Sequence, residues 1–259
     1  MNLEEFKKKL SLKKEKLIVV VQDPISSKKM SYIVSNDMTL YRARTLFTKE
    51  PFTIDWLRSF KKDSIFYDIG ANVGMYSIFA ACISKANVYS FEPEANNFQV
   101  LVENVVANKL INKVNSFPIG ISNSSSLTTL YLSSFKTGSS HHMVGESLDR
   151  DLNKKESEYK QGIFSTSLED LVKIWKLPIP NYIKIDVDGI EYKIIEKSDF
   201  LLKNMDLRSI LIEMNSKTDE GKYIISKLKS FDFVYDKKQV DVILEERHRG
   251  YAEYIFYRK

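Results

Sequence analysis

Short apolar runs alternate with segments of helical periodicity over most of the chain, beginning near residue 63. The apolar runs have the length of buried strands, and the segments between them repeat their apolar residues every three or four positions. The predicted strands cover residues 65–69, 88–92, 114–120, 182–187, 209–214, 231–235 and 253–257. The predicted helices cover residues 73–84, 95–108, 167–175, 190–202 and 220–229. This alternation predicts an α/β fold with a mostly parallel seven-stranded sheet and helices on both faces.

The first 62 residues show a different pattern, and we expect them to form an extension that packs on the domain of residues 63–259. The Lys-rich amphipathic stretch at the start favours a solvated surface helix over an anchor for a membrane or a partner. The predicted elements are this helix over residues 3–16, a hairpin of residues 17–21 and 31–34, and a helical segment over residues 40–60 that Pro51 interrupts.

The alternation breaks between residues 122 and 161. This segment is polar and rich in Ser, with one strand-like stretch at residues 127–132. It is too long for a plain connection between a strand and a helix. We therefore expect an insertion that serves as an active-site loop or lid.

Composition narrows the class of protein. The chain has 259 residues, 43% of them apolar, which suffices for a normal core and excludes global disorder. The net charge of +5 is mild and argues against a nucleic-acid-binding protein. The single cysteine, Cys82, permits no internal disulfide and favours a reducing compartment. No apolar run reaches the roughly 18 residues of a membrane span, and no signal peptide is apparent, so a cytoplasmic protein is expected.

A glycine-containing turn follows the first strand of the α/β domain. Asp68 ends this strand, and Gly70 and Gly74 flank the turn that leads into a helix. A dinucleotide site would need glycine where the chain has Asn72 and Met75. Asp68 would repel an anionic phosphate but suits a cofactor with a positive sulfonium and an amino group. The spacing therefore favours S-adenosylmethionine over a dinucleotide.

Acidic residues also end the following strands. Glu92 lies 22 positions after Gly70, where an acid is placed to accept hydrogen bonds from ribose hydroxyls. Asp186 ends a buried strand, and Glu213 ends the next one. Because the ligand crevice of an open α/β sheet lies outside the carboxyl ends of its strands, we expect these acids at one site.

The runs YDIGANVGMYS, FEPEANNF and IKIDVDGIEYKIIE, in this order, resemble the FkbM family of methyltransferases over roughly residues 50–215. The resemblance implies a class I Rossmann-like methyltransferase fold and S-adenosylmethionine-dependent O-methylation of sugars, glycolipids, polysaccharides or macrolide-type natural products. Where the family usually has Val-Glu-Gly, this chain has a shorter acid, Asp188. The cofactor-binding residues that we expect from the resemblance and the neighbouring positions are Asp68, Gly70, Ala71, Asn72, Gly74, Ser77, Glu92, Pro93, Asn96, Gly120, Ile121 and Asp186.

Four residues are candidates for catalysis: Asp186, His141, His142 and Glu213. A histidine in the polar insertion suits a general base near neutral pH, although an exposed polar pair explains the two histidines equally well. Positioning should supply most of the acceleration, because the sulfonium is already a good leaving group. The carboxylates lack a diagnostic metal-ligand spacing, so we expect no metal site and activity that survives a chelator.

The acceptor is expected to be a small molecule or a glycan, with a sugar hydroxyl as the favoured target. Ser, Thr, Asn and His side chains of residues 122–161 can hydrogen-bond a polyol. Two other classes stay open: a methyltransferase for natural products or nucleic acid, and a non-catalytic Rossmann-like binding module. The sequence gives no indication of the oligomeric state.

Overall fold

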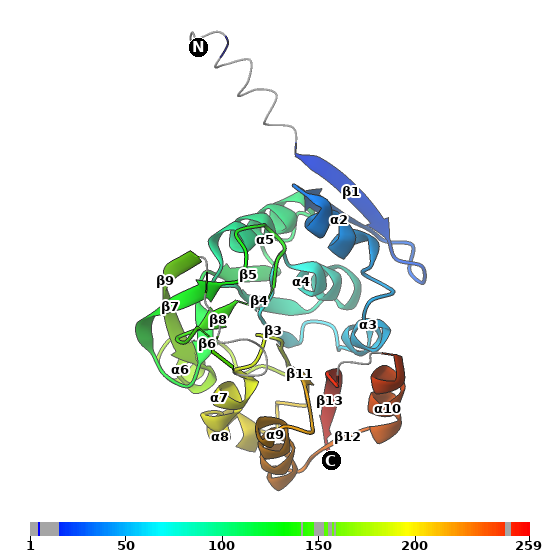
Figure 1. Cartoon of the computed structure of the whole chain (residues 1–259). Coiled ribbons are helices and arrows are strands. Elements are labelled where there is room, and N and C mark those ends of the chain that lie inside the picture. The colour runs from blue at the N-terminus through cyan, green and yellow to red at the C-terminus, as the bar shows by residue number, and fades with distance from the viewer. Residues whose placement is uncertain are drawn as a thin grey trace.

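The computed structural model describes Glu5 and residues 16–140, 142–147, 153–154, 157, 159–246 and 250–259. A seven-stranded sheet forms its centre, in the order β12-β13-β11-β10-β3-β4-β5 (Figure 1). The strands are β3 (Ile65–Ile69), β4 (Asn87–Phe91), β5 (Val114–Phe117), β10 (Tyr182–Ile185), β11 (Ser209–Met214), β12 (Phe233–Tyr235) and β13 (Ala252–Arg258). Neighbouring strands from β11 to β5 run parallel, and only β13 pairs antiparallel, with β11 and β12. The predicted mostly parallel seven-stranded sheet is confirmed.

Two apolar clusters cover the two faces of the sheet, because successive side chains of a strand point to opposite faces. Phe66 belongs to the first cluster and Tyr67 to the second. The first cluster includes residues of α2 (Asp37–Arg44), α3 (Pro51–Arg58), α4 (Met75–Phe79), the π-helix η1 (Ala80–Ser84) and α5 (Ala95–Ala107). The second includes residues of α6 (Leu168–Lys173), α7 (Glu191–Glu196), α8 (Asp199–Lys203), α9 (Asp219–Ser230) and α10 (Lys237–Glu246).

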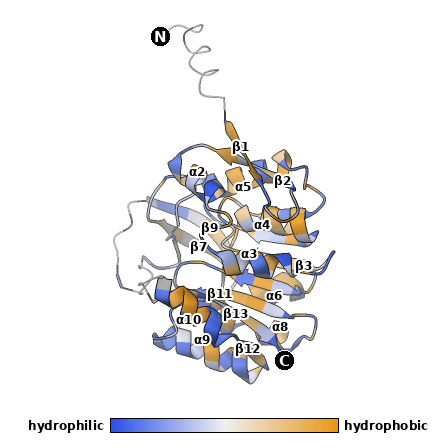
Figure 2. Ribbon diagram, turned by 90° about the vertical axis from the view of Figure 1, so that its right-hand side faces the viewer, coloured by the Kyte–Doolittle hydropathy of each residue, from blue (hydrophilic) through white to orange (hydrophobic). Residues whose placement is uncertain are grey.

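Apolar residues of the N-terminal extension belong to the first of these two clusters and pack against the main sheet. Its hairpin of β1 (Leu17–Gln22) and β2 (Lys29–Val34) is the predicted one. The side-chain oxygen of Asn104 in α5 accepts the Ile33 N–H at 2.7 Å, which fixes the hairpin to the domain. Trp56 of α3 packs edge-on against Phe66 of β3. Figure 2 shows β1 as a hydrophobic strand at the edge of the molecule. Most of the helix predicted for residues 3–16 lies outside the described residues.

The insertion and the residues on either side of it form a second sheet, in which the strand-like stretch predicted at residues 127–132 is present. Its order is β6-β9-β7-β8 (green in Figure 1), with β6 (Gly120–Ser122), β7 (Ser126–Leu132), β8 (Met143–Val144) and β9 (Tyr159–Ser167). The prediction missed β9 because its second half is polar, although Ser165, Thr166 and Ser167 are all buried. Leu130, Leu132 and Ile163 give the sheet a small core of its own.

Other predicted boundaries were wrong in detail. The strand predicted for residues 114–120 is two strands, since Pro118 has no N–H to donate to a ladder. The helix predicted for residues 190–202 is α7 and α8, and α10 was missed between the two closing strands. No helix within the described part of the chain is both long and apolar enough to cross a bilayer.

Candidate active site

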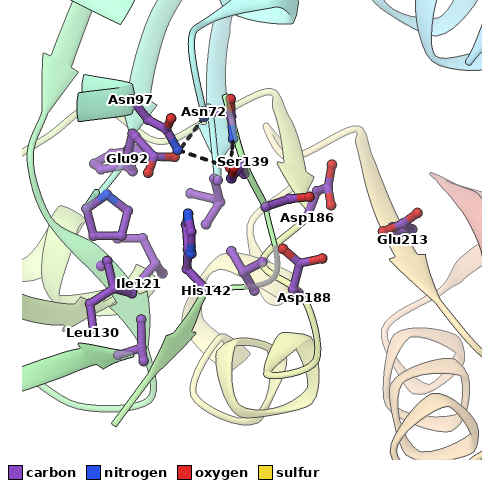
Figure 3. Close-up of a pocket in the computed structure, with 18 of the residues that line it drawn as sticks. Asn72, Glu92, Asn97, Ile121, Leu130, Ser139, His142, Asp186, Asp188 and Glu213 are labelled. Atoms are coloured by element: carbon purple, nitrogen blue, oxygen red, sulfur yellow. Dashed lines mark hydrogen bonds between the residues drawn. The ribbon is translucent and has the colours of Figure 1, made fainter. Parts of the chain in front are cut away.

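A cavity of about 250 Å³ opens at the carboxyl ends of β3, β4 and β10, where the small sheet and the N-terminal extension also contribute to its wall. Figure 3 shows Glu92 with Asn97 on one side of it, Asp186 and Asp188 on the other, and His142 between them. The predicted site residues that line the cavity are Gly70, Asn72, Glu92, Pro93, Gly120, Ile121, His142, Asp186 and Glu213. An adjoining cavity of about 40 Å³ adds Ala71.

The turn after β3 depends on glycine at position 70. Gly70 has φ +76°, and a Cβ there would lie 2.0 Å from the carbonyl oxygen of Asp186. The N–H groups of Gly70 and Ala71 both donate to the Phe91 carbonyl, at 3.0 and 3.1 Å. Asn72 continues the turn in the left-handed region, with φ +50°. Strain of this kind persists only where the surroundings fix the backbone, and it is concentrated at functional sites.

Asp68 and Ser77 lie behind this turn and do not line the cavity. The Ser77 hydroxyl donates to Asp68 Oδ2 at 2.5 Å. Burial raises the pKa of Asp68, while the charge of Lys184 and the hydrogen bond from Ser77 act in the opposite direction. Asp68 Oδ1 is buried with no hydrogen-bond partner among the described residues. Its role as a cofactor contact stays a prediction.

Gly74 also lies away from the cavity. It is the N-cap of α4 with φ +82°, and a Cβ there would lie 2.3 Å from Leu101 Cδ1 of α5. Glycine at this position therefore lets two helices pack closely. Asn96 lies at the start of α5, where its side chain donates to Glu94 Oε1 at 3.0 Å. Both residues support the elements that carry the site.

Glu92 is the buried acid on the β4 side of the cavity. Its Oε2 accepts the Asn72 N–H at 2.7 Å, and its Oε1 accepts the Glu94 N–H at 2.9 Å. Burial raises the pKa of Glu92 to about 7, against these two donors, which lower it. The cavity wall nearby is apolar and contains Phe91, Ile119 and Ile121. A carboxylate can accept hydrogen bonds from hydroxyl groups, and an apolar wall beside it can pack against the flat face of a ring.

Three carboxylates converge on the other side. Oxygen atoms of Asp186, Asp188 and Glu213 lie within 4.8 Å of one another, a separation at which they can share a cation. Lys184 Nζ donates to Asp186 Oδ2 at 2.7 Å. Burial lowers the pKa of Lys184, but the negative charges of Asp186, Asp68 and Glu50 outweigh burial and hold this pKa above its usual range. The ammonium group of Lys184 therefore places a buried positive charge next to these acids.

The loop that carries Asp188 is held by the first residue of α7. The side chain of Glu191 accepts the N–H groups of Val187 and Gly189, at 3.2 and 3.0 Å. Asp188 itself has φ +64°, a conformation that Asp tolerates better than most residues. Burial raises the pKa of Glu191 to about 7, against the N–H donors that lower it. Glu191 thus positions the acidic loop.

Residues 138–139 of the insertion are attached to both the turn after β3 and the N-terminal extension. The side-chain amide of Asn72 donates to the Ser139 carbonyl at 2.7 Å, and the Gly138 N–H donates to Asn97 Oδ1 at 2.7 Å. Arg42 Nε of α2 donates to the Gly138 carbonyl at 2.7 Å. The insertion is therefore part of the cavity wall.

Of the two candidate histidines, His142 lines the cavity. The Ser133 N–H donates to His142 Nδ1 at 3.2 Å, which requires an unprotonated Nδ1. His141 lies outside the described residues.

Several cavity residues were not predicted from the sequence. Asn97 is the neighbour of the predicted residue Asn96. It lies one helical turn after Glu94, the N-cap of α5, and this spacing could have indicated its place near the cavity. Arg42, Lys49 and Ser139 belong to no recognised motif, so only the three-dimensional structure reveals them.

Two sequence comparisons with known proteins each match most of the chain. The family model described as the methyltransferase FkbM domain matches residues 68–251. The hexuronic acid methyltransferase AglP of Haloferax volcanii is 25% identical over 188 residues, which cover 73% of this chain and 71% of AglP.

Two solved structures show a distant likeness of fold. A precorrin-6y C5,15-methyltransferase from Geobacter metallireducens is 12% identical with a TM-score of 0.46, and the match covers 81% of this chain and 86% of that one. TYW2 of P. horikoshii, in complex with MeSAdo, has the same identity and TM-score over 95% and 73% of the two chains. Since the family model spans well over half of its length, the chain belongs to the FkbM family of methyltransferases.

Proposed function

We propose that this methyltransferase moves the methyl group of S-adenosylmethionine to a hydroxyl group of a sugar in a glycan or glycoconjugate. One observation carries the proposal: Glu92 and Asp186 lie on opposite sides of a single cavity (Figure 3). Gly70 lies between the two strand ends, because its N–H donates to the Phe91 carbonyl and its Cα approaches the Asp186 carbonyl closely. Membership of the FkbM family and the name of the relative AglP support the methyl transfer and the sugar.

The cavity residues fit the chemical groups of this cofactor. Ionised Glu92 suits the ribose hydroxyls, and the apolar wall at Phe91 and Ile121 suits the adenine ring. Gly70 lets the backbone approach the ligand closely. Asp186 gives the opposite side the negative charge that a sulfonium and an ammonium group favour.

When bound, the cofactor supplies a methyl group on a positive sulfonium. The acceptor oxygen forms a bond to this carbon as the carbon–sulfur bond breaks, and the sulfur leaves as a neutral thioether. The hydroxyl proton must pass to a base, for which Asp186 is the described candidate in the cavity wall. His142 would take that proton only after its Nδ1 releases the Ser133 N–H, because a neutral imidazole that accepts at Nδ1 carries its own proton on Nε2. Holding the two reactants in line is the main contribution of the protein.

Calorimetry with S-adenosylmethionine and turnover with a labelled methyl group test the proposal together. We expect saturable cofactor binding, and transfer that falls at least about 100-fold in Asp186→Asn, the lower bound for a lost general base. Absence of cofactor binding would leave only the non-catalytic module. Transfer to a nucleic acid in place of a sugar would refute the acceptor.

A further inference from the structure

Two cations from the N-terminal extension face the candidate site. Arg42 comes from α2, and Lys49 comes from the segment before α3. Both line the main cavity and the adjoining one, together with Gly70, Asn72 and Asp186. The extension therefore supplies two positive charges to a site whose described carboxylates and side-chain amides come from the α/β domain.

Arg42 is held with its guanidinium at the cavity. Its Nε donates to the Gly138 carbonyl at 2.7 Å, which fixes the plane of the group. The structure shows no hydrogen bond from its two Nη atoms to any described residue. A guanidinium with two parallel N–H donors matches the two oxygens of a carboxylate.

Lys49 adds a second positive charge beside it. Lys49 Nζ lies 2.5 Å from Oε1 of Glu50, a buried residue. Burial lowers the pKa of Lys49, and so does the positive charge of Arg42. The negative charges of Glu50 and Asp186 outweigh both effects and hold the pKa of Lys49 above its ordinary value. Arg42 and Lys49 thus lie close enough for their charges to act on each other, and both line the same cavity.

We propose that Arg42 and Lys49 bind the carboxylate of an acidic sugar, so that the acceptor is a uronic acid. This inference rests on the proposed function and narrows its acceptor. The name of the relative AglP also contains a hexuronic acid, without stating which group of that sugar is methylated. Two cations holding the carboxylate anchor the sugar and leave one of its hydroxyls to be methylated.

The methionine part of the cofactor also carries a carboxylate, so the experiment must separate the two sources. The probes are the methyl glycosides of glucuronic and galacturonic acid, each paired with its neutral counterpart, methyl glucoside and methyl galactoside. Their affinities are measured by NMR titration against full-length protein saturated with S-adenosylhomocysteine. The variants are Arg42→Gln and Lys49→Gln, with Arg44→Gln as the control, because Arg44 is an exposed arginine on the same helix.

We expect at least one uronide to bind roughly tenfold or more tightly than its neutral partner, as charged hydrogen bonds typically give. Arg42→Gln and Lys49→Gln should remove this preference, Arg44→Gln should keep it, and S-adenosylmethionine should bind all four proteins equally. Absence of a preference, whether both members of each pair bind or neither does, overturns the proposal. Cofactor binding weakened tenfold in the two variants also overturns it, because the cations then serve the cofactor. If the protein methylates neutral sugars, the uronic acid inference is wrong, whereas the proposed sugar methylation still holds.

Discussion

The backbone N–H of Asn72 donates a 2.7 Å hydrogen bond to Oε2 of Glu92. This bond joins the turn after β3 to the acid after β4, two segments 20 positions apart in the sequence. Asn72 also donates to the Ser139 carbonyl through its side chain, so one residue connects the turn after β3, the buried acid and the insertion. The geometry of the cavity therefore depends on a few hydrogen bonds at the strand ends.

Replacing Glu92 is expected to weaken S-adenosylmethionine binding by about 1–3 kcal/mol, the usual cost of losing a charge-assisted hydrogen bond. Glu92→Gln keeps the size of the side chain and removes its charge. Calorimetry on the folded variant measures the effect, and Glu245→Gln on the exposed side of α10 is the control. Equal affinity in Glu92→Gln and wild type would show that this acid does not bind the ribose.

Cofactor affinity should also depend on pH. The pKa of Glu92 is raised to about 7, so the side chain is mostly protonated at pH 6 and mostly ionised at pH 8. Only the ionised form accepts hydrogen bonds through both oxygens. Affinity should therefore rise about tenfold between pH 6 and pH 8, and calorimetry at a series of pH values measures this rise. The same slope in Glu92→Gln would assign the titration to another group.

Gly70→Ala should disrupt the site. The added Cβ would lie 2.0 Å from the Asp186 carbonyl in a backbone conformation unfavourable for alanine, so β3 and β10 would have to separate. We expect a loss of at least about 2 kcal/mol in the free energy of unfolding, and no detectable cofactor binding. Gly162→Ala is the matched control, because nothing lies within 4 Å of a Cβ there. Urea unfolding of both variants compares them, and equal stability would contradict the close approach.

Lys184→Met should be strongly destabilising. Lys184 is 1% exposed, and its charge offsets those of Asp186, Asp68 and Glu50. Removing one partner leaves uncompensated buried charge, which typically costs about 3–5 kcal/mol. Lys222→Met removes an exposed lysine paired with Asp219 and should change the free energy of unfolding by less than about 1 kcal/mol. Similar unfolding curves for the two variants would show that Lys184 does not neutralise the acids.

The sequence predicted the main sheet well because its strands are buried and apolar, and each of the seven is present. It failed for β9, where Ser165 and Thr166 are buried in a sheet although polar. Motif reasoning likewise predicted Glu92 and Asp186, which directly follow β4 and β10 and line the cavity. It could not identify Arg42 or Lys49, because their place at the cavity arises from how the extension packs.

The position of the transferred methyl group tests the central claim most directly. The wild-type protein is supplied with S-adenosylmethionine carrying a ¹³C-labelled methyl group and with glycans from the source cell, and the product is analysed by NMR. The account predicts a methyl ether on a sugar ring. At a cofactor concentration below saturation, less of this product should form with Glu92→Gln, in proportion to its loss of cofactor binding. A label on nitrogen, on carbon, on a nucleobase or as a methyl ester would contradict transfer to a sugar hydroxyl.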